Sequence, residues 1–180
     1  MISVGNLPNT FYVILPASYI IWKNRYIRVL MLRQLQLTDK AKMLELVNKT
    51  QIFAPEEVSF IADTFEGESS EAVWFGKFEG ERMIGVAYCV PMEMTNATWN
   101  VLMLLVDPEH HRRGIGKELM QLMESTLTQK GQRLLIVETS STDDFRTARS
   151  FYRAIGYAQQ GAIEHYYDDD DHKITFIKRL

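Results

Sequence analysis

Residues 107–120 read DPEHHRRGIGKELM and join two apolar stretches of different character. The preceding run VLMLLV, residues 101–106, is continuously apolar, which is typical of a central strand covered on both faces. After the glycines, apolar residues recur with helical spacing up to Gly131, at Ile115, Leu119, Leu122, Met123 and Leu127. The sequence therefore predicts a buried strand, a glycine-containing loop and an amphipathic helix.

Such a loop is suited to bind phosphate oxygens. The first turn of a helix has unpaired N–H groups and a positive dipole end, and Gly114 and Gly116 allow close approach of the backbone. A P-loop is excluded because Gly116 is followed by Lys117 and Glu118, without the required glycine spacing or Ser/Thr. A dinucleotide fingerprint is excluded because Leu119 stands where its third glycine belongs.

The remaining pattern predicts one α/β domain with a mixed sheet. The three strands at 72–79, 82–90 and 97–106 are joined by short turns, so we expect them to be antiparallel. A strand, helix and strand in series predict that 133–139 lies parallel to 97–106. The other expected elements are a strand at 26–35, a helix capped by Thr38, a helix from Pro55 to Gly67, a helix ending at Gly156, and a final hairpin whose solvated turn contains Asp168 to Asp171.

Composition limits the classes of partner. The chain has 180 residues with 46% hydrophobic and 24% charged content and a formal net charge of −3, so neither nucleic acid nor a membrane is expected as partner. Cys89 is the single cysteine, which excludes an internal disulfide. We interpret Cys89 as a small buried apolar residue rather than a nucleophile.

The first residues are expected to form an extension, 1–27, to a domain over 28–180. Residues 11–22 are uncharged but interrupted by Pro16, and they are shorter than the about 20 residues that span a bilayer. Residues 1–10 lack the positive charge of a secretory signal, so we expect a cytoplasmic protein. The extension is interpreted as a strand or irregular segment packed on the domain, as a contact for a second subunit in a homodimer, or as a leader before a start at Met31.

The loop resembles the acyl-CoA loop of the GCN5-related N-acetyltransferase (GNAT) superfamily. In that family a Gln or Arg, two arbitrary residues, a Gly, another residue and a Gly or Ala receive the pyrophosphate of coenzyme A. Here the first position is His111, a departure from the family, but main-chain N–H groups make most of the contacts. The resemblance covers about residues 28–180 and implies a mostly antiparallel mixed sheet with flanking helices and a splayed parallel strand pair. It implies these cofactor-binding residues: Leu104, Leu105 and Val106 through their backbone, and His111, Arg112, Arg113, Gly114, Ile115, Gly116, Lys117 and Asp143.

The resemblance also implies two catalytic residues. Tyr152, four residues before Gly156, matches the tyrosine that faces the sulfur and hydrogen-bonds the leaving thiolate. Glu138 ends a strand at the mouth of the splay, where some members carry the base that accepts the amine proton through water. The alternatives are that Tyr152 only packs in the core and that Glu138 only anchors a nearby N–H or arginine.

Several further positions have two interpretations. Glu93, Glu56 and Glu57 are weaker candidates for the base. Phe145 stands where the family often has asparagine, with Asp143 and Asp144 just ahead. The acidic run either forms a solvated turn or lines the acceptor groove, and the following aromatic residues either shape the acceptor pocket or belong to the core: Phe53, Trp74, Phe75, Tyr166 and Tyr167.

The resemblance implies an enzyme that transfers the acetyl group of acetyl-CoA to a primary amine of a small molecule by direct attack. No metal is expected, because the adjacent His110 and His111 lack further ligands at useful spacing. The alternatives are an acyl-CoA-binding regulatory module without turnover and a protein or peptide N-acetyltransferase.

Overall fold

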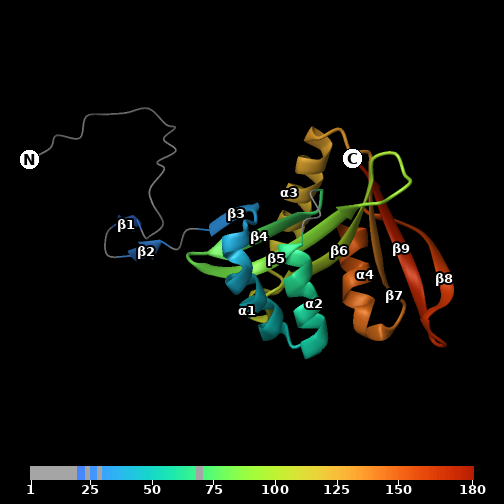
Figure 1. Cartoon of the computed structure of the whole chain (residues 1–180), viewed down its shortest axis with the longest axis horizontal. Helices are drawn as coiled ribbons and strands as arrows, with labels where there is room; N and C mark the ends of the chain where they lie inside the picture. Colours follow the sequence, from blue (N-terminus) through green and yellow to red (C-terminus); the bar gives the residue numbers. More distant parts are fainter. Residues whose placement is uncertain (1–19, 23–24, 28–29, 68–70) are drawn as a thin grey trace, which may run out of the picture.

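The computed structural model describes residues 20–22, 25–27, 30–67 and 71–180. Seven strands form one sheet in the order β3-β4-β5-β6-β7-β9-β8, and β1 and β2 form a separate two-stranded sheet (Figure 1). The strands are β1 (Ile20–Trp22), β2 (Arg25–Ile27), β3 (Leu30–Gln34), β4 (Val73–Glu79), β5 (Arg82–Pro91), β6 (Thr98–Val106), β7 (Leu134–Ser140), β8 (Ala158–Asp168) and β9 (Asp171–Arg179). The helices are α1 (Lys40–Thr50), α2 (Pro55–Glu66), α3 (Ile115–Gln129) and α4 (Arg146–Ala154), with short 3-10 turns η1 (Leu37–Asp39), η2 (Pro108–His110) and η3 (Asp143–Phe145).

The predicted mixed sheet is confirmed. Strands β6 and β7 are parallel, and every other pair of neighbours in the seven-stranded sheet is antiparallel. The parallel ladder has four pairs, from Thr98 with Leu134 to Val101 with Val137. Beyond Val137, strand β7 continues to pair with β9, while β6 continues to pair with β5. The two parallel strands therefore separate after their first halves.

A β-bulge at Leu102 coincides with the start of this separation. Tyr88 of β5 pairs with Met103 and Cys89 pairs with Val101, so Leu102 has no partner on β5. An extra residue reverses the alternation of side chains between the two faces of a strand. Accordingly, Val101 packs into the core beneath α3 while Met103 packs into the core beneath α1, although they are two residues apart.

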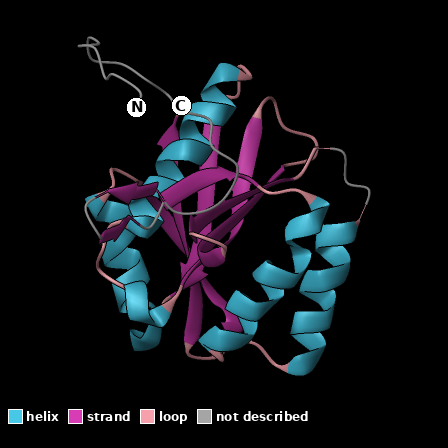
Figure 2. Ribbon diagram, turned by 90° about the vertical axis from the view of Figure 1, so that its left-hand side faces the viewer, coloured by secondary structure: helices cyan, strands magenta, loops and turns pink. Residues whose placement is uncertain are grey.

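Helices cover both faces of the sheet (Figure 2). On one face, α1 and α2 bury residues such as Met43, Val47 and Phe65. On the other face, α3 and α4 bury residues such as Leu119 and Tyr152. The continuously apolar strands of the sequence are explained by this double cover.

Gly85 allows α3 to approach the sheet closely. A Cβ atom at this position would lie 2.8 Å from Cγ2 of Ile115 and 2.9 Å from Cδ1 of Leu119. Both are buried residues in the first half of α3. Because Gly85 has no side chain, the start of α3 can pack directly against β5, close to the end of β6.

Two boundaries differ from the prediction. The expected strand over 26–35 is divided into β2 and β3, which belong to different sheets. Thr38 lies inside η1 and does not cap α1, because the carboxylate of Asp39 instead accepts the N–H of Gln36 at 2.9 Å and pairs with Arg33 at 2.7 Å. The expectations for residues 1–19, including a second-subunit contact, lie outside the described residues. Within those that are described, no helix combines the length and apolar character needed to cross a membrane.

Candidate active site

The loop before α3 presents a set of free main-chain donors. Among the described residues, none accepts a hydrogen bond from the N–H groups of residues 112 to 117, and the first helical bond runs from Glu118 N to Gly114 O at 3.0 Å. Gly114 is the N-cap with φ of +81°, and Arg112 has φ of +60°. Arg112 and Arg113 are exposed, so they add local positive charge to the dipole end of α3. This arrangement fits an anion with several oxygens.

Asp107 anchors the start of the loop. Its fully buried carboxylate accepts the N–H of Glu109 at 3.0 Å and pairs with Lys49 at 2.9 Å and with Arg82. Burial raises the pKa of this carboxyl, but the hydrogen bonds and charges of Lys49 and Arg82 outweigh burial and leave the pKa below its usual value. The end of β6 is thus tied to α1 and β5.

The acidic side chains beside the loop are paired with cationic side chains of the protein. Side chains of Asp107, Glu109 and His110 lie within 4.8 Å of one another. Lys49 and Arg82 contact both carboxylates, and the buried ring of His110 lies 3.6 Å from Asp107. His111 turns elsewhere, with Nε2 3.0 Å from the carbonyl oxygen of Val106. The two adjacent histidines therefore do not converge on a common point.

The gap between β6 and β7 exposes backbone groups of β6. Asp107 N donates to Ile84 O of β5 at 3.0 Å, so the alternation of an antiparallel ladder directs the backbone groups of Leu105 towards β5 as well. Those of Leu104 and Val106 are directed towards the gap. Among the three β6 residues expected to bind through their backbone, Leu104 and Val106 are therefore the ones whose N–H groups are available.

Tyr152 lies next to the point where the strands part. Its ring is 5.8 Å from that of Phe176, which pairs with Val137, the last residue of β7 that pairs with β6. Burial raises the pKa of the Tyr152 phenol to about 12. Its hydroxyl donates no hydrogen bond within the described part of the chain. Tyr152 is thus a buried, protonated phenol with a free hydroxyl on the α3 and α4 face of the gap.

Glu138 borders the gap from the opposite face. It follows Val137 on β7, and since Val137 packs beneath α3, alternation directs Glu138 to the face covered by α1 and α2. Its carboxylate forms an ion pair with Lys173 at 2.9 Å. The Nζ atom of Lys173 also lies 3.9 Å from the centre of the Tyr166 ring. Burial lowers the pKa of Lys173, but the hydrogen bond and charge of Glu138, together with the contact to Tyr166, outweigh burial and raise the pKa.

A pocket of about 540 Å³ opens on this same face. Its floor is a stacked pair, Trp74 and Tyr88, with ring centres 3.9 Å apart. The two residues that follow the last β6–β7 pair on β6, Leu102 and Met103, contribute to its wall. The other lining residues come from α2 and the segment before it: Phe53, Glu56, Glu57, Phe60, Ile61 and Thr64. We name this the aromatic pocket.

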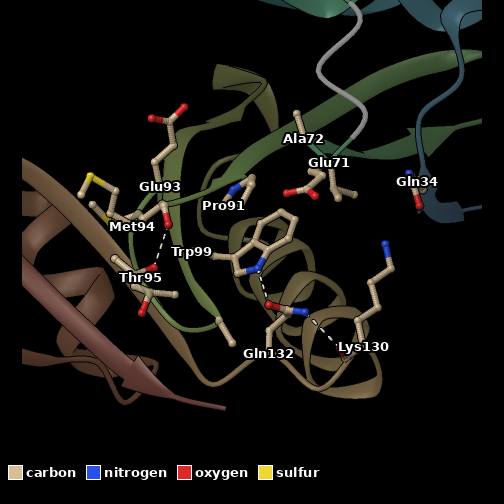
Figure 3. Close-up of a pocket in the computed structure, with 14 residues that line it drawn as sticks. Gln34, Glu71, Ala72, Pro91, Glu93, Met94, Thr95, Trp99, Lys130 and Gln132 are labelled. Atoms are coloured by element: carbon tan, nitrogen blue, oxygen red, sulfur yellow. Dashed lines mark hydrogen bonds between the residues drawn. The ribbon is translucent and has the colours of Figure 1, made fainter.

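A second hollow, of about 600 Å³, lies at the other end of β6 (Figure 3). It is lined by residues near the start of β6 and the end of α3, including Trp99, whose indole N–H donates to Gln132 at 2.8 Å. Glu93 also lines it, and its carboxylate points away from Trp99 in Figure 3. Glu93 is therefore separated from the gap, whereas Glu56 and Glu57 reach the aromatic pocket.

Asp143, Phe75 and the acidic run, the remaining expected site residues, lie at the surface or in the core. Asp143 is exposed in η3 and pairs with Arg146 at 2.7 Å. Phe75 belongs to the core beneath α3, on the face opposite its neighbour Trp74. In the acidic run, Asp168 to Asp170 are exposed at the hairpin turn, while Asp171 accepts hydrogen bonds from Ser140 Oγ at 2.6 Å and Ser141 N at 3.1 Å. The predicted hairpin turn is confirmed.

Sequence reasoning missed several side chains of the site, among them Tyr88, Phe60, Leu102 and Lys173. Tyr88 and Leu102 sit in strands that read as continuously apolar, so their sequence gives no indication of which face they occupy. Phe60 could have been found, because Val58, Ile61 and Phe65 recur with helical spacing and Phe60 falls outside this apolar stripe.

Comparison with known proteins finds a family model that matches most of the chain. The model of the acetyltransferase (GNAT) family matches residues 40–157. No curated protein sequence matches the chain.

Solved structures share the fold. A GNAT-family protein from Desulfovibrio desulfuricans superposes with a TM-score of 0.78 at 23% identity, over 84% of this chain and 99% of that one. The ribosomal-protein-S18-alanine N-acetyltransferase from Escherichia coli gives 0.69 at 19% identity, over 84% and 94% of the two chains. An aminoglycoside 6'-N-acetyltransferase in complex with coenzyme A gives 0.68 at 15% identity, over 83% and 96%. With a family model that covers well over half of its length, this chain belongs to the acetyltransferase (GNAT) family.

Proposed function

We propose that this protein transfers the acetyl group of acetyl-CoA to a primary amine of a small molecule by direct attack. The observation that carries the proposal is the gap after Val101 and Val137, because three groups suited to separate tasks border the gap or its end. The free N–H groups of residues 112–117 lie at one end of the gap, Tyr152 lies on one face, and Glu138 lies on the other.

The loop would hold the diphosphate of coenzyme A. Main-chain N–H groups at a helix N-terminus bind phosphate oxygens, and Arg112 and Arg113 add charge. The pantetheine arm would then lie in the gap against the N–H groups of Leu104 and Val106. One of these N–H groups is suited to polarise the thioester carbonyl.

The transfer places nucleophile and leaving group on opposite faces of the sheet. The amine nitrogen attacks the thioester carbon from the side of Glu138, which takes the amine proton through a water molecule. The C–S bond breaks, and the thiolate accepts a hydrogen bond from Tyr152 on the other side. A thiol has a pKa of about 8.5, so complete proton transfer from a phenol with a pKa of about 12 would cost about 5 kcal/mol. Tyr152 therefore stabilises the thiolate by hydrogen bonding, and solvent supplies the final proton.

The size of the aromatic pocket supports a small-molecule acceptor. A volume of about 540 Å³ is within the range of small-molecule sites, which are about 300 to 1,000 Å³. Glu56 and Glu57 line the pocket and favour a cationic substrate. A peptide would instead be expected to lie in an extended groove.

The test is release of free thiol from acetyl-CoA in the presence of an amine panel that includes peptides. We expect thiol release with small primary amines. Tyr152→Phe should lower turnover by about 100-fold, in the range of proton-transfer groups, and leave the KM for acetyl-CoA nearly unchanged. Tyr157→Phe is the matched control, because Tyr157 is equally buried but its hydroxyl is bonded to Glu124 at 3.0 Å.

Other outcomes favour the alternatives. Thermal stabilisation by acetyl-CoA without thiol release from any amine or peptide would favour an acyl-CoA-binding regulatory module. Thiol release with peptides alone would favour a protein N-acetyltransferase. Unchanged turnover of Tyr152→Phe would remove Tyr152 from the mechanism.

A further inference from the structure

The aromatic pocket is more apolar than the binding of a generic amine requires. Its floor and walls are formed by Trp74, Tyr88, Phe53, Phe60, Ile61, Leu102 and Met103. Phe60 is 72% exposed and Leu102 is 57% exposed, although both are large apolar side chains. Exposed apolar residues that cluster in a concave site mark a surface that binds an apolar ligand.

The charged groups of the pocket are few and acidic. Among the described lining residues, only Glu56 and Glu57 are charged. The Glu57 carboxylate accepts the N–H of Ala54 at 2.8 Å and caps α2, whereas the Glu56 carboxylate has no partner within the described chain. The hydroxyl of Thr64 already donates to Phe60 O at 2.7 Å. A ligand therefore meets negative charge at α2 and apolar surface elsewhere.

These contacts discriminate between amine classes. A polyhydroxylated amine would lose water from many hydroxyl groups and find few partners in the pocket, which costs free energy for each group left unpaired. A short hydrophilic amine would leave Phe60 and Leu102 uncovered. An amine attached to an aromatic ring covers these side chains, and the negative charge of Glu56 favours entry of its cationic form into the pocket.

We propose that the preferred acceptor is an arylalkylamine: a primary amine on a short chain that ends in an aromatic ring. The ring lies against Phe60 and Leu102, and the amine is directed to the gap, where Glu138 borders it. Figure 1 shows α2, which carries Phe60, near β6, which carries Leu102, and both residues line the aromatic pocket. This inference rests on the proposed acetyl transfer.

The experiment compares kcat/KM for thiol release with tryptamine and 2-phenylethylamine against spermidine, ethanolamine and kanamycin. We expect the two aryl amines to exceed each polar amine by at least about 30-fold. Phe60→Ser should raise the KM for tryptamine about tenfold and leave the KM for ethanolamine unchanged. Leu37→Ser is the matched control, because Leu37 is 67% exposed but lies outside the pocket. Since Phe60 and Leu37 are both exposed, neither change removes a core contact.

Charge is tested separately. Glu56→Gln should raise the KM for tryptamine about threefold at low salt, with a smaller effect at high salt. Glu45→Gln on α1, an exposed carboxylate outside the pocket, should have no effect. Higher kcat/KM for the polar amines, or equal effects of Phe60→Ser on tryptamine and ethanolamine, would overturn the inference while the acetyl transfer stands. Absence of thiol release with every amine would instead reject the proposed function itself, and this inference with it.

Discussion

Val101 and Val137 form the last pair of the parallel β6–β7 ladder; beyond them β7 pairs only with β9, and β6, after the unpaired Leu102, pairs only with β5. The bulge at Leu102 starts at the same point. The sheet therefore has a gap between β6 and β7, while the β5–β6 and β7–β9 ladders remain intact. All three groups to which we assign a chemical task, the loop of residues 112–117, Tyr152 and Glu138, border this gap or its end.

Substitution of two glycines at opposite ends of α3 tests whether the loop binds coenzyme A. Gly114 has φ of +81° and Gly131 has φ of +73°, and a Cβ atom at either position would contact nothing within 4 Å. Substitution by alanine therefore strains both backbones to a similar extent, by about 1 kcal/mol. We expect Gly114→Ala to raise the Kd for coenzyme A about tenfold, because relief of the strain moves the N–H groups. Gly131→Ala should lower stability similarly and leave the Kd unchanged, as measured by calorimetry; equal Kd values would contradict the assignment of the loop.

The pH dependence of turnover tests the protonation state of Tyr152. Because burial raises its phenol pKa to about 12, the group remains a hydrogen-bond donor over the usual assay range. With a saturating amine, kcat should rise as the amine loses its proton and then stay level to about pH 10.5. The measurement is a full pH profile for the natural protein and Tyr152→Phe. A decline in kcat with an apparent pKa near 10, seen only when Tyr152 is present, would show an ionisable phenol in contact with water.

Cys89 should have no part in the chemistry. Its side chain is fully buried on β5, and burial raises the pKa of the thiol to about 12, so thiolate is scarce at neutral pH. We expect Cys89→Ala to keep turnover within about twofold, and iodoacetamide to leave the folded natural protein active. A trapped acetyl-enzyme that disappears in Cys89→Ala would contradict direct transfer.

Asp107 should stabilise the protein in a pH-dependent way. Its pKa in the folded protein is below the ordinary value, so its contribution is present above that ordinary value, near pH 4, and is lost as the pH falls through the folded pKa. Asp107→Asn should therefore lower the melting temperature at pH 7 by roughly 5 °C, and the difference should shrink below pH 4. The exposed pair of Asp143 with Arg146 provides the control, since Asp143→Asn should change the melting temperature little. A deficit for Asp107→Asn that is the same at pH 7 and pH 3 would contradict this account.

Local patterns in the sequence sufficed for most of the fold. The glycines at 114 and 116 located the loop, Pro55 located the start of α2, and the apolar run before Asp107 located the central strand. The α/β mixed sheet followed from the order of these elements. Such features are determined by residues close together in the chain, so they can be predicted from the sequence alone.

The details of the site depend on contacts between distant residues. Trp74 and Phe75 are adjacent in a strand buried on both faces, and no local signal decides which one reaches the aromatic pocket. The bulge at Leu102 has no glycine to mark it. The ion pair of Glu138 with Lys173 joins residues that become neighbours only when β7 and β9 pair.

Amide hydrogen exchange on the natural protein tests the central claim most directly. On addition of coenzyme A, we expect the N–H groups of residues 112–117, together with those of Leu104 and Val106, to become protected from exchange. The N–H groups at the other end of α3, around Gly131, should exchange as before. Binding of coenzyme A that leaves the loop and β6 amides unprotected would contradict the account, because the diphosphate and the pantetheine arm would then lie elsewhere.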